Sequence, residues 1–276
     1  MPYRIGDDHI DLAGTSLECR WIGPPPDQAP TIVLLHEGIG CVALWRDFPD
    51  KLATATGCGV IAYSRRGYGH SDPIVRPRPL DFMHDEAENV LAKLLDAIGF
   101  RRGILLGHSD GASIATIYAG SVQDHRVRGV VLFAPHFFVE DLSIESIEAA
   151  KIRYQSGDLR PRLAKFHGNN VDGAFYGWND VWLDPGFRDW SIENEIAHIR
   201  VPILIVQGAG DEYGTLAQLE AAREEAYCPV ETVVLERSGH APHIDRPEAT
   251  LDAVSRFIAR LMRDHAEAAP LRLATG

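Results

Sequence analysis

Short apolar runs alternate along the chain with longer segments in which apolar residues recur every three or four positions. The short runs are rich in valine, isoleucine and leucine, as is typical of strands buried on both faces of a sheet. This alternation predicts an α/β protein whose mostly parallel central sheet is flanked by helices. The predicted strands are residues 31–35, 59–63, 103–106, 127–133, 201–206 and 231–235, and the clearest helices are residues 81–98, 112–119 and 247–262.

The rhythm changes between Pro135 and Ile199, where strong strand patterns are missing and aromatic residues are frequent. An insertion between two strands must bury its apolar side chains, and ligands of open α/β sheets bind at the carboxyl edge of the strands. We therefore expect one core interrupted by an insertion: core segments at residues 1–135 and 200–276, and an inserted helical cap at residues 136–199.

Composition narrows the function classes. The chain has 276 residues, 45% of them hydrophobic, and a formal net charge of −12, which argues against nucleic acid as a partner. Its four cysteines lack CxxC spacing, as expected for reduced thiols in a cytoplasmic protein. No stretch has the apolar length of a signal peptide or a membrane span, so we expect no membrane partner, whereas the sequence leaves a homo-oligomer open.

A glycine-flanked serine follows the predicted strand at residues 103–106. The pentapeptide Gly107-His108-Ser109-Asp110-Gly111 stands between this strand and an alanine-rich helix. A sharp strand-to-helix turn needs small residues on both sides and projects the middle side chain over the sheet edge. Ser109 is therefore the candidate nucleophile; the alternative is a glycine-rich turn in another α/β fold.

A serine nucleophile needs a base, and the base needs an acid that orients it. Asp211 follows the predicted strand at residues 201–206, and His240 follows the strand at residues 231–235, so both are expected at the same sheet edge as Ser109. Glu212 is the rival for the acid and His243 the rival for the base. A metal site built from the two histidines lacks a matching carboxylate pattern, so no metal is expected.

With these motifs the chain resembles the α/β-hydrolase superfamily over nearly its whole length, in particular its single-cap branch of serine esterases, C–C hydrolases and haloperoxidase-like enzymes. The resembling pieces are His36-Glu37-Gly38, residues 64–71, the Ser109 turn, the Asp211 loop, and Gly239-His240 followed by Asp245 and Pro247. The resemblance implies an oxyanion hole made by the backbone N–H groups of Asp110 and Gly38.

Two positions depart from the family pattern. Ser64 stands where the family usually has aspartate, and Glu37 stands where it usually has glycine. A carboxylate in an oxyanion hole would repel the developing negative charge, so we expect Glu37 to turn away and pair with Arg65 or Arg66. The alternative is a solvated glutamate. If Glu37 pairs with an arginine, replacing it by glutamine should lower the stability of the fold more than the catalytic activity.

Other residues near the predicted sheet edge divide into structural and substrate-binding candidates. His36 and His108 are expected to satisfy backbone groups around their turns. His136, Phe137, Phe138 and Trp178 are expected to contact substrate. The alternative for such aromatic residues is that they form the core of the cap itself.

The resulting hypothesis is a serine hydrolase that cleaves carboxylic esters of small to medium, apolar or aromatic molecules through an acyl-enzyme, without any cofactor. A C–C bond hydrolase of the ring-cleavage-product type is the alternative within the superfamily. A ligand receptor or scaffold with slow turnover is the alternative of another class, and the number of turnovers would distinguish it from an esterase.

Overall fold

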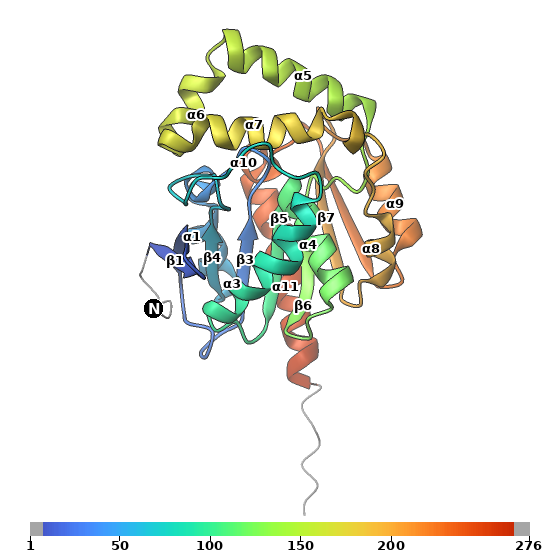
Figure 1. Ribbon diagram of the computed structural model, residues 1–276. Coiled ribbons are helices and arrows are strands. Elements are labelled where there is room, and N and C mark those ends of the chain that lie inside the picture. The colour runs from blue at the N-terminus through green and yellow to red at the C-terminus, as the bar shows by residue number, and fades with distance from the viewer. Residues whose placement is uncertain (1–7, 268–276) are drawn as a thin grey trace, which may run out of the picture.

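The computed structural model describes the backbone of residues 8–267 and the side chains of residues 8–262, so the outermost ends of the two expected core segments lie outside the described residues. Eight strands form one sheet in the order β1-β2-β4-β3-β5-β6-β7-β8 (Figure 1). β2 pairs antiparallel with β1 and β4, and the remaining pairs are parallel. The predicted α/β class with a mostly parallel sheet is confirmed.

The predicted strands are present, with ends that shift by up to two residues, and β1 and β2 were not predicted. The strands are β1 His9–Leu12, β2 Thr15–Ile22, β3 Thr31–Leu35, β4 Gly59–Tyr63, β5 Gly103–His108, β6 Val127–Phe133, β7 Ile203–Gly208 and β8 Val230–Leu235.

Helices connect the parallel strands, as a parallel sheet requires. The helix predicted over residues 81–98 is continuous from α2 to α3, with a π-helical stretch, Glu86–Leu91, in its middle. The helices are α1 Phe48–Thr56, α2 Phe82–Asp85, α3 Ala92–Ala97, α4 Asp110–Ile117, α5 Asp141–Ser156, α6 Leu159–His167, α7 Val171–Trp182, α8 Glu193–His198, α9 Ala217–Glu225, α10 Pro242–Asp245 and α11 Pro247–Glu267.

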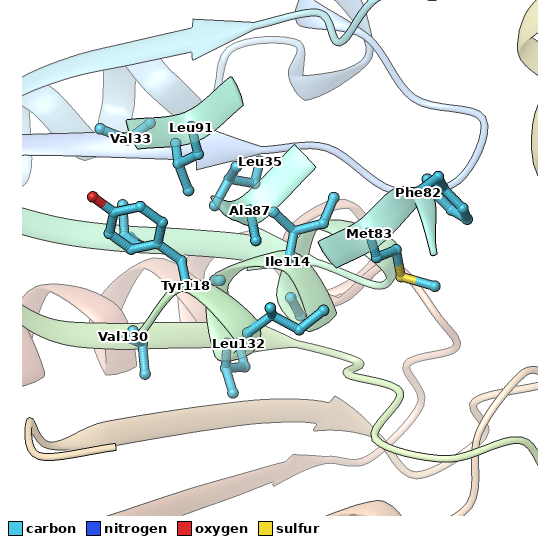
Figure 2. Close-up of a cluster of buried hydrophobic side chains, with 14 of the residues drawn as sticks. Val33, Leu35, Phe82, Met83, Ala87, Leu91, Ile114, Tyr118, Val130 and Leu132 are labelled. Carbon is cyan, nitrogen blue, oxygen red and sulfur yellow. The ribbon is translucent and has the colours of Figure 1, made fainter. Parts of the chain in front are cut away.

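The sheet is buried on both faces because successive side chains of a strand point in opposite directions. In β3, Val33 and Leu35 join the cluster on one face, while Ile32 and Leu34 join the cluster on the other. Figure 2 shows the first of these clusters, in which strand residues meet side chains from α2, the π-helical stretch and α4. This double burial explains why the strands appear in the sequence as continuous apolar runs.

The segment between β6 and β7 supplies a helical layer above one end of the sheet. Helices α5, α6 and α7 lie over the carboxyl ends of the strands (Figure 1), whereas α8 packs beside the sheet against α4 and α9. Two hydrogen bonds of His167 tie this layer to the core: the Gly69 N–H donates to Nδ1 at 3.0 Å, and Nε2 donates to the Ile39 carbonyl at 3.1 Å. In the described part of the chain, no helix is both long and apolar enough to cross a membrane.

The turn between β5 and α4 leaves no room for a side chain at Gly111. A Cβ there would lie 2.0 Å from the Leu35 carbonyl oxygen, whereas a Cβ on Gly173 in α7 would meet nothing closer than 3.7 Å. We expect Gly111→Ala to lower the free energy of unfolding by about 1–3 kcal/mol, because backbone of β3 must move. The matched change Gly173→Ala should raise it by about 0.5–1 kcal/mol, since alanine favours a helix. Urea unfolding measures both; equal midpoints for the two variants would contradict this packing.

Candidate active site

Ser109 occupies a strained turn between β5 and α4. Its φ is 54° and its ψ is −120°, a combination that L-residues with side chains rarely adopt. Gly107 and Gly111 permit the turn, because a Cβ on Gly107 would lie 2.1 Å from the Gly111 carbonyl oxygen. The serine is 5% exposed and lines a cavity of about 300 Å³ at the carboxyl edge of the sheet.

Asp211 and His240 meet at the same edge. Nδ1 of His240 donates a hydrogen bond of 2.8 Å to Oδ1 of Asp211, whose side chain is only 2% exposed. The same oxygen accepts the backbone N–H of Tyr213 at 2.9 Å, which holds the carboxylate in place. With its proton on Nδ1, the His240 ring keeps Nε2 free to accept one. Ser109 and His240 line the same cavity, although no hydrogen bond joins them among the described residues.

The rivals for the acid and the base have other contacts. Oε2 of Glu212 accepts the backbone N–H of His240 at 3.2 Å rather than a ring nitrogen. His243 is buried in the core, where its ring stacks on Phe133 and packs against Trp45. Burial lowers the pKa of His243 to about 3, so this ring is neutral at physiological pH. The described residues hold no group of three or more His, Cys, Asp or Glu side chains arranged for a metal ion.

Arg65 holds the turn after β3 from behind. Its fully buried guanidinium donates from Nη1 to the His36 carbonyl and from Nη2 to the Glu37 carbonyl, at 2.5 and 3.0 Å. Nδ1 of His36 donates to the same Glu37 carbonyl at 2.7 Å, and Nε2 accepts the Arg65 backbone N–H at 3.0 Å. The Glu37 carbonyl and the Gly38 N–H belong to one peptide group and point in opposite directions. These two side-chain donors, together with the Gly40 N–H at 3.1 Å from the same carbonyl oxygen, therefore fix the direction of the Gly38 N–H and polarise it.

The expected pairing of Glu37 with Arg65 or Arg66 is wrong. Arg65 binds main-chain carbonyls instead, and Nε of Arg66 donates to the Pro73 carbonyl. The Glu37 carboxylate folds back over Gly40 and faces Nδ1 of His108 at 3.5 Å, with 23% of its side chain exposed. The buried His108 imidazole, and not a guanidinium, faces the Glu37 carboxylate because Arg65 already bonds the main chain of the turn.

His108 connects three loops of the site. Nε2 of His108 donates to the His240 carbonyl at 2.7 Å, while Nδ1 faces Glu37. Burial alone would raise the pKa of Glu37, but the neighbouring His108 ring lowers it well below its usual value. The turn after β3, the Ser109 turn and the His240 loop are thus linked by a histidine that is expected from sequence to be structural.

The departure at Ser64 is compensated by a residue on the neighbouring strand. Oγ of Ser64 donates to Oε2 of Glu18 at 2.6 Å and accepts the Val42 N–H at 2.9 Å. The same carboxylate oxygen accepts the His70 N–H at 3.1 Å. Glu18 in β2 therefore supplies the carboxylate that the family usually carries at position 64.

The cavity is walled by the cap and by the loops that follow the strands. A Cβ on Gly38 would lie 2.2 Å from Nε1 of Trp178, so the indole packs directly on this turn. Nε1 of Trp182 donates to Oδ1 of Asp110 at 3.1 Å. The lining residues are Glu37, Gly38, Ile39, His108, Ser109, Asp110, His136, Ile147, Trp178, Trp182, Glu212, Tyr213, Gly239, His240, Ala241 and Asp245.

The four expected substrate contacts divide into two pairs. His136 and Trp178 line the cavity, and burial lowers the pKa of His136 to about 3. Phe137 lies in the hydrophobic core with its N–H bonded to the Gln218 side chain, and Phe138 packs against that core; neither lines the cavity of the described chain. The backbone after β6 turns toward α9 immediately after His136, which directs both phenylalanines away.

Some cavity residues were not expected. Trp182 follows Trp178 by one helical turn, and this spacing could have identified it, since such residues share a helix face. Ile147 and Tyr213 carry no comparable signal, because their places depend on how α5 and the loop after β7 pack.

Comparisons with known proteins show the family and the fold. A family profile described as "Alpha/beta hydrolase family" matches residues 32–253. The human "Serine hydrolase BPHL" is 28% identical over 55% of this chain and 53% of its own length, so the match spans about half of that relative. "Proline iminopeptidase" of Lactobacillus delbrueckii subsp. lactis is 25% identical over 95% of this chain and 87% of its own.

Solved structures show the same fold. The crystal structure of a membrane phospholipase A, described as a novel bacterial virulence factor, superimposes with a TM-score of 0.74 at 21% identity, over 92% of this chain and 86% of that one.

The contact between Glu37 and His108 predicts a pH-dependent stability. A carboxyl whose pKa is lower in the folded than in the unfolded chain stabilises the fold above its ordinary pKa of 4.5, and this contribution is lost as the pH falls. We expect Glu37→Gln to cost about 1 kcal/mol at pH 7 and progressively less below pH 4.5. Urea unfolding between pH 7 and pH 4 measures this gap, the difference in free energy of unfolding between wild type and Glu37→Gln. The exposed Glu224→Gln is the control. A gap that stays constant with pH would contradict the role of the charge.

Proposed function

The chain belongs to the alpha/beta hydrolase family, and we propose that it is a serine hydrolase that cleaves carboxylic esters through Ser109, His240 and Asp211. One observation carries the proposal: the Asp211–His240 hydrogen bond ends in the same cavity as a serine held at a strained strand-to-helix turn. A hydroxyl, an imidazole and a carboxylate in this relation are the groups that acyl transfer requires.

The reaction proceeds in two steps. His240 Nε2 takes the proton of the Ser109 hydroxyl as its oxygen attacks the carbonyl carbon, and the protonated ring then donates to the leaving alcohol. Water, activated by the same nitrogen, hydrolyses the acyl-enzyme and restores the hydroxyl. Asp211 stays ionised: burial alone would raise its pKa, but the bond to His240 lowers it below the ordinary value. The Ser109 hydroxyl and the His240 ring approach each other to complete the proton path, because catalytic hydrogen bonds are often long in ligand-free sites.

The backbone N–H groups of Asp110 and Gly38 serve as the oxyanion hole in this mechanism. Asp110 begins α4, so its N–H is one of the unpaired donors at a helix start. The Gly38 N–H is directed by the bonds of Arg65 and His36 to the carbonyl of the same peptide group. Donors fixed before the reaction lower the barrier because they need no reorganisation when charge develops.

The remaining features of the cavity fit a small-molecule substrate. Its volume of about 300 Å³ is at the lower end for ligand sites, and Ile147, Trp178 and Trp182 give it apolar walls. No step of the mechanism needs a metal or an organic cofactor. Cys41, Cys58 and Cys228 are free thiols, which supports a reducing, cytoplasmic location as part of the proposal.

Replacing the nucleophile tests the reaction class. We expect wild-type protein to hydrolyse short nitrophenyl esters and Ser109→Ala to lose at least about 10³-fold in kcat/KM, since the acyl-enzyme cannot form. A vinylogous diketone in the same panel reports C–C bond cleavage. Ester turnover that survives in Ser109→Ala, or cleavage of the diketone alone, would contradict the ester mechanism.

The acid limb of the pH profile tests the role of Asp211. Burial alone would lower the pKa of His240, but its bond to Asp211 outweighs burial and raises the pKa above 6.5. Because the base must be neutral, kcat/KM should fall as the pH drops through an apparent pKa above 6.5. In Asp211→Asn this limb should move to lower pH, and the plateau should fall roughly 10³–10⁴-fold. An unchanged acid limb of kcat/KM in Asp211→Asn would show that the Asp211–His240 pair has no role in catalysis.

A further inference from the structure

The charge of the cavity lining is one-sided. Four lining residues carry carboxyl groups, Glu37, Asp110, Glu212 and Asp245, and no lysine or arginine lines the cavity in the described part of the chain. Within the same part, none of these carboxylates lies within 4.0 Å of a lysine or arginine nitrogen; Glu37 contacts a histidine. The lining is therefore acidic without the basic partners that usually neutralise such a cluster.

Three guanidinium groups lie near the cavity without lining it. Arg153 bonds the side chain of Tyr213, a residue of the lining. Both terminal nitrogens of Arg65 donate to the carbonyls of the turn after β3. Arg78 donates to the Tyr68 hydroxyl and to the Arg66 carbonyl. These charges moderate the potential behind the cavity, but they supply no ion-pair partner inside it.

One carboxylate oxygen of the cavity floor is buried without any partner. Asp110 is fully buried, and its Oδ1 accepts the Trp182 indole N–H, whereas Oδ2 has no hydrogen bond among the described residues. A buried, unpartnered acceptor is costly in a folded protein unless a ligand satisfies it. Asp110 is one of the residues that line the cavity, so a hydrogen-bond donor on a ligand that reaches this carboxylate would offset the cost.

At the mouth, two exposed carboxylates converge on one loop. Oε2 of Glu212 accepts the His240 N–H at 3.2 Å, and Oδ2 of Asp245 accepts the Gly239 N–H at 2.8 Å. Each of these carboxylates has a second oxygen that makes no hydrogen bond within the described chain. The two negative charges therefore flank the entrance on the side of His240.

Aromatic side chains complete the walls. Trp178 and Trp182 line the cavity from α7, and Tyr213 lines it from the loop after β7. The faces of such rings attract cations through their quadrupole, most strongly when water is excluded. Aromatic rings and carboxylates without a lysine or arginine partner together favour one class of ligand, a small organic cation.

We propose that the substrate of this cavity carries a positively charged ammonium group, attached to the acyl or the alcohol part of the ester. The inference rests on the proposed esterase function for the bond that is cleaved, and it adds the charge of the molecule. The net charge of −12 acts in the same direction, since it raises the local concentration of cations around the protein.

A pair of isosteric esters tests this charge preference. Acetylcholine and 3,3-dimethylbutyl acetate have the same shape and differ only in the quaternary nitrogen. We expect kcat/KM for the cationic ester to be at least about tenfold higher at low ionic strength, and the ratio to fall as sodium chloride is added. Equal kcat/KM for the two esters would overturn the inference while leaving the esterase function intact.

Variants locate the preference in the cavity. Glu212→Gln and Asp245→Asn remove one charge each but keep an oxygen that can accept the backbone N–H. The ratio of kcat/KM for the two esters, measured on the same variant, should fall several-fold in each. Replacing the exposed Glu224 of α9 by glutamine removes the same charge and should keep the wild-type ratio. An equal fall in all three would assign the preference to net charge and overturn the cavity site.

If no ester is hydrolysed, the proposed function is wrong. A binding experiment then still tests the charge preference. Calorimetry on Ser109→Ala with choline and with 3,3-dimethylbutanol compares the cation with its neutral isostere without any chemistry. Tighter binding of choline supports the ammonium site, and equal or undetectable binding of choline overturns it.

Discussion

The parallel register of the central strands brings residues distant in sequence to one edge. Leu35 of β3 is level with Gly107 of β5, and Gly208 of β7 is level with Leu235 of β8, so the loops that follow these strands emerge side by side. β3, β5 and β7 hold this register because each is buried on both faces, and a shift by one residue would send every side chain to the opposite cluster. The meeting of the Ser109 turn, the Asp211 loop and the His240 loop follows from this alignment.

Above the sheet, the loops are fixed largely by side chains bonded to main-chain groups. Arg65 and His36 hold the turn after β3, His108 holds the carbonyl of His240, and His167 connects the cap to the core. Such bonds remove the freedom of a loop, and of these four side chains only His108 lines the cavity. They also explain the burial of so many titratable groups around a site of about 300 Å³.

Much of this could be predicted from the sequence, because the signals are local. Ser109 stands in a pattern that only a tight turn requires, and Asp211 follows a strand directly. The strands β1 and β2 could not be predicted in this way, since Thr15–Ile22 mixes polar with apolar residues and is only partly buried, whereas the central strands are continuous, fully buried apolar runs. The partner of Glu37 was mispredicted because charge complementarity favoured arginine, whereas the carbonyls of the turn had already engaged Arg65.

The bond between Ser64 and the Glu18 carboxylate also could not be predicted from the sequence, because it depends on the pairing of β2 with β4. Phe137 and Phe138 show the same limit: composition indicates an aromatic cap, but only the path of the backbone after β6 decides which rings reach the cavity.

The central claim is that the hydroxyl of Ser109 is an activated nucleophile. Incubation with a fluorophosphonate followed by mass spectrometry of the intact protein and its peptides measures this directly. The account predicts one adduct per chain, on the peptide that contains Ser109, formed far more slowly in His240→Ala. Labelling at another residue, or no labelling of correctly folded protein, would contradict it.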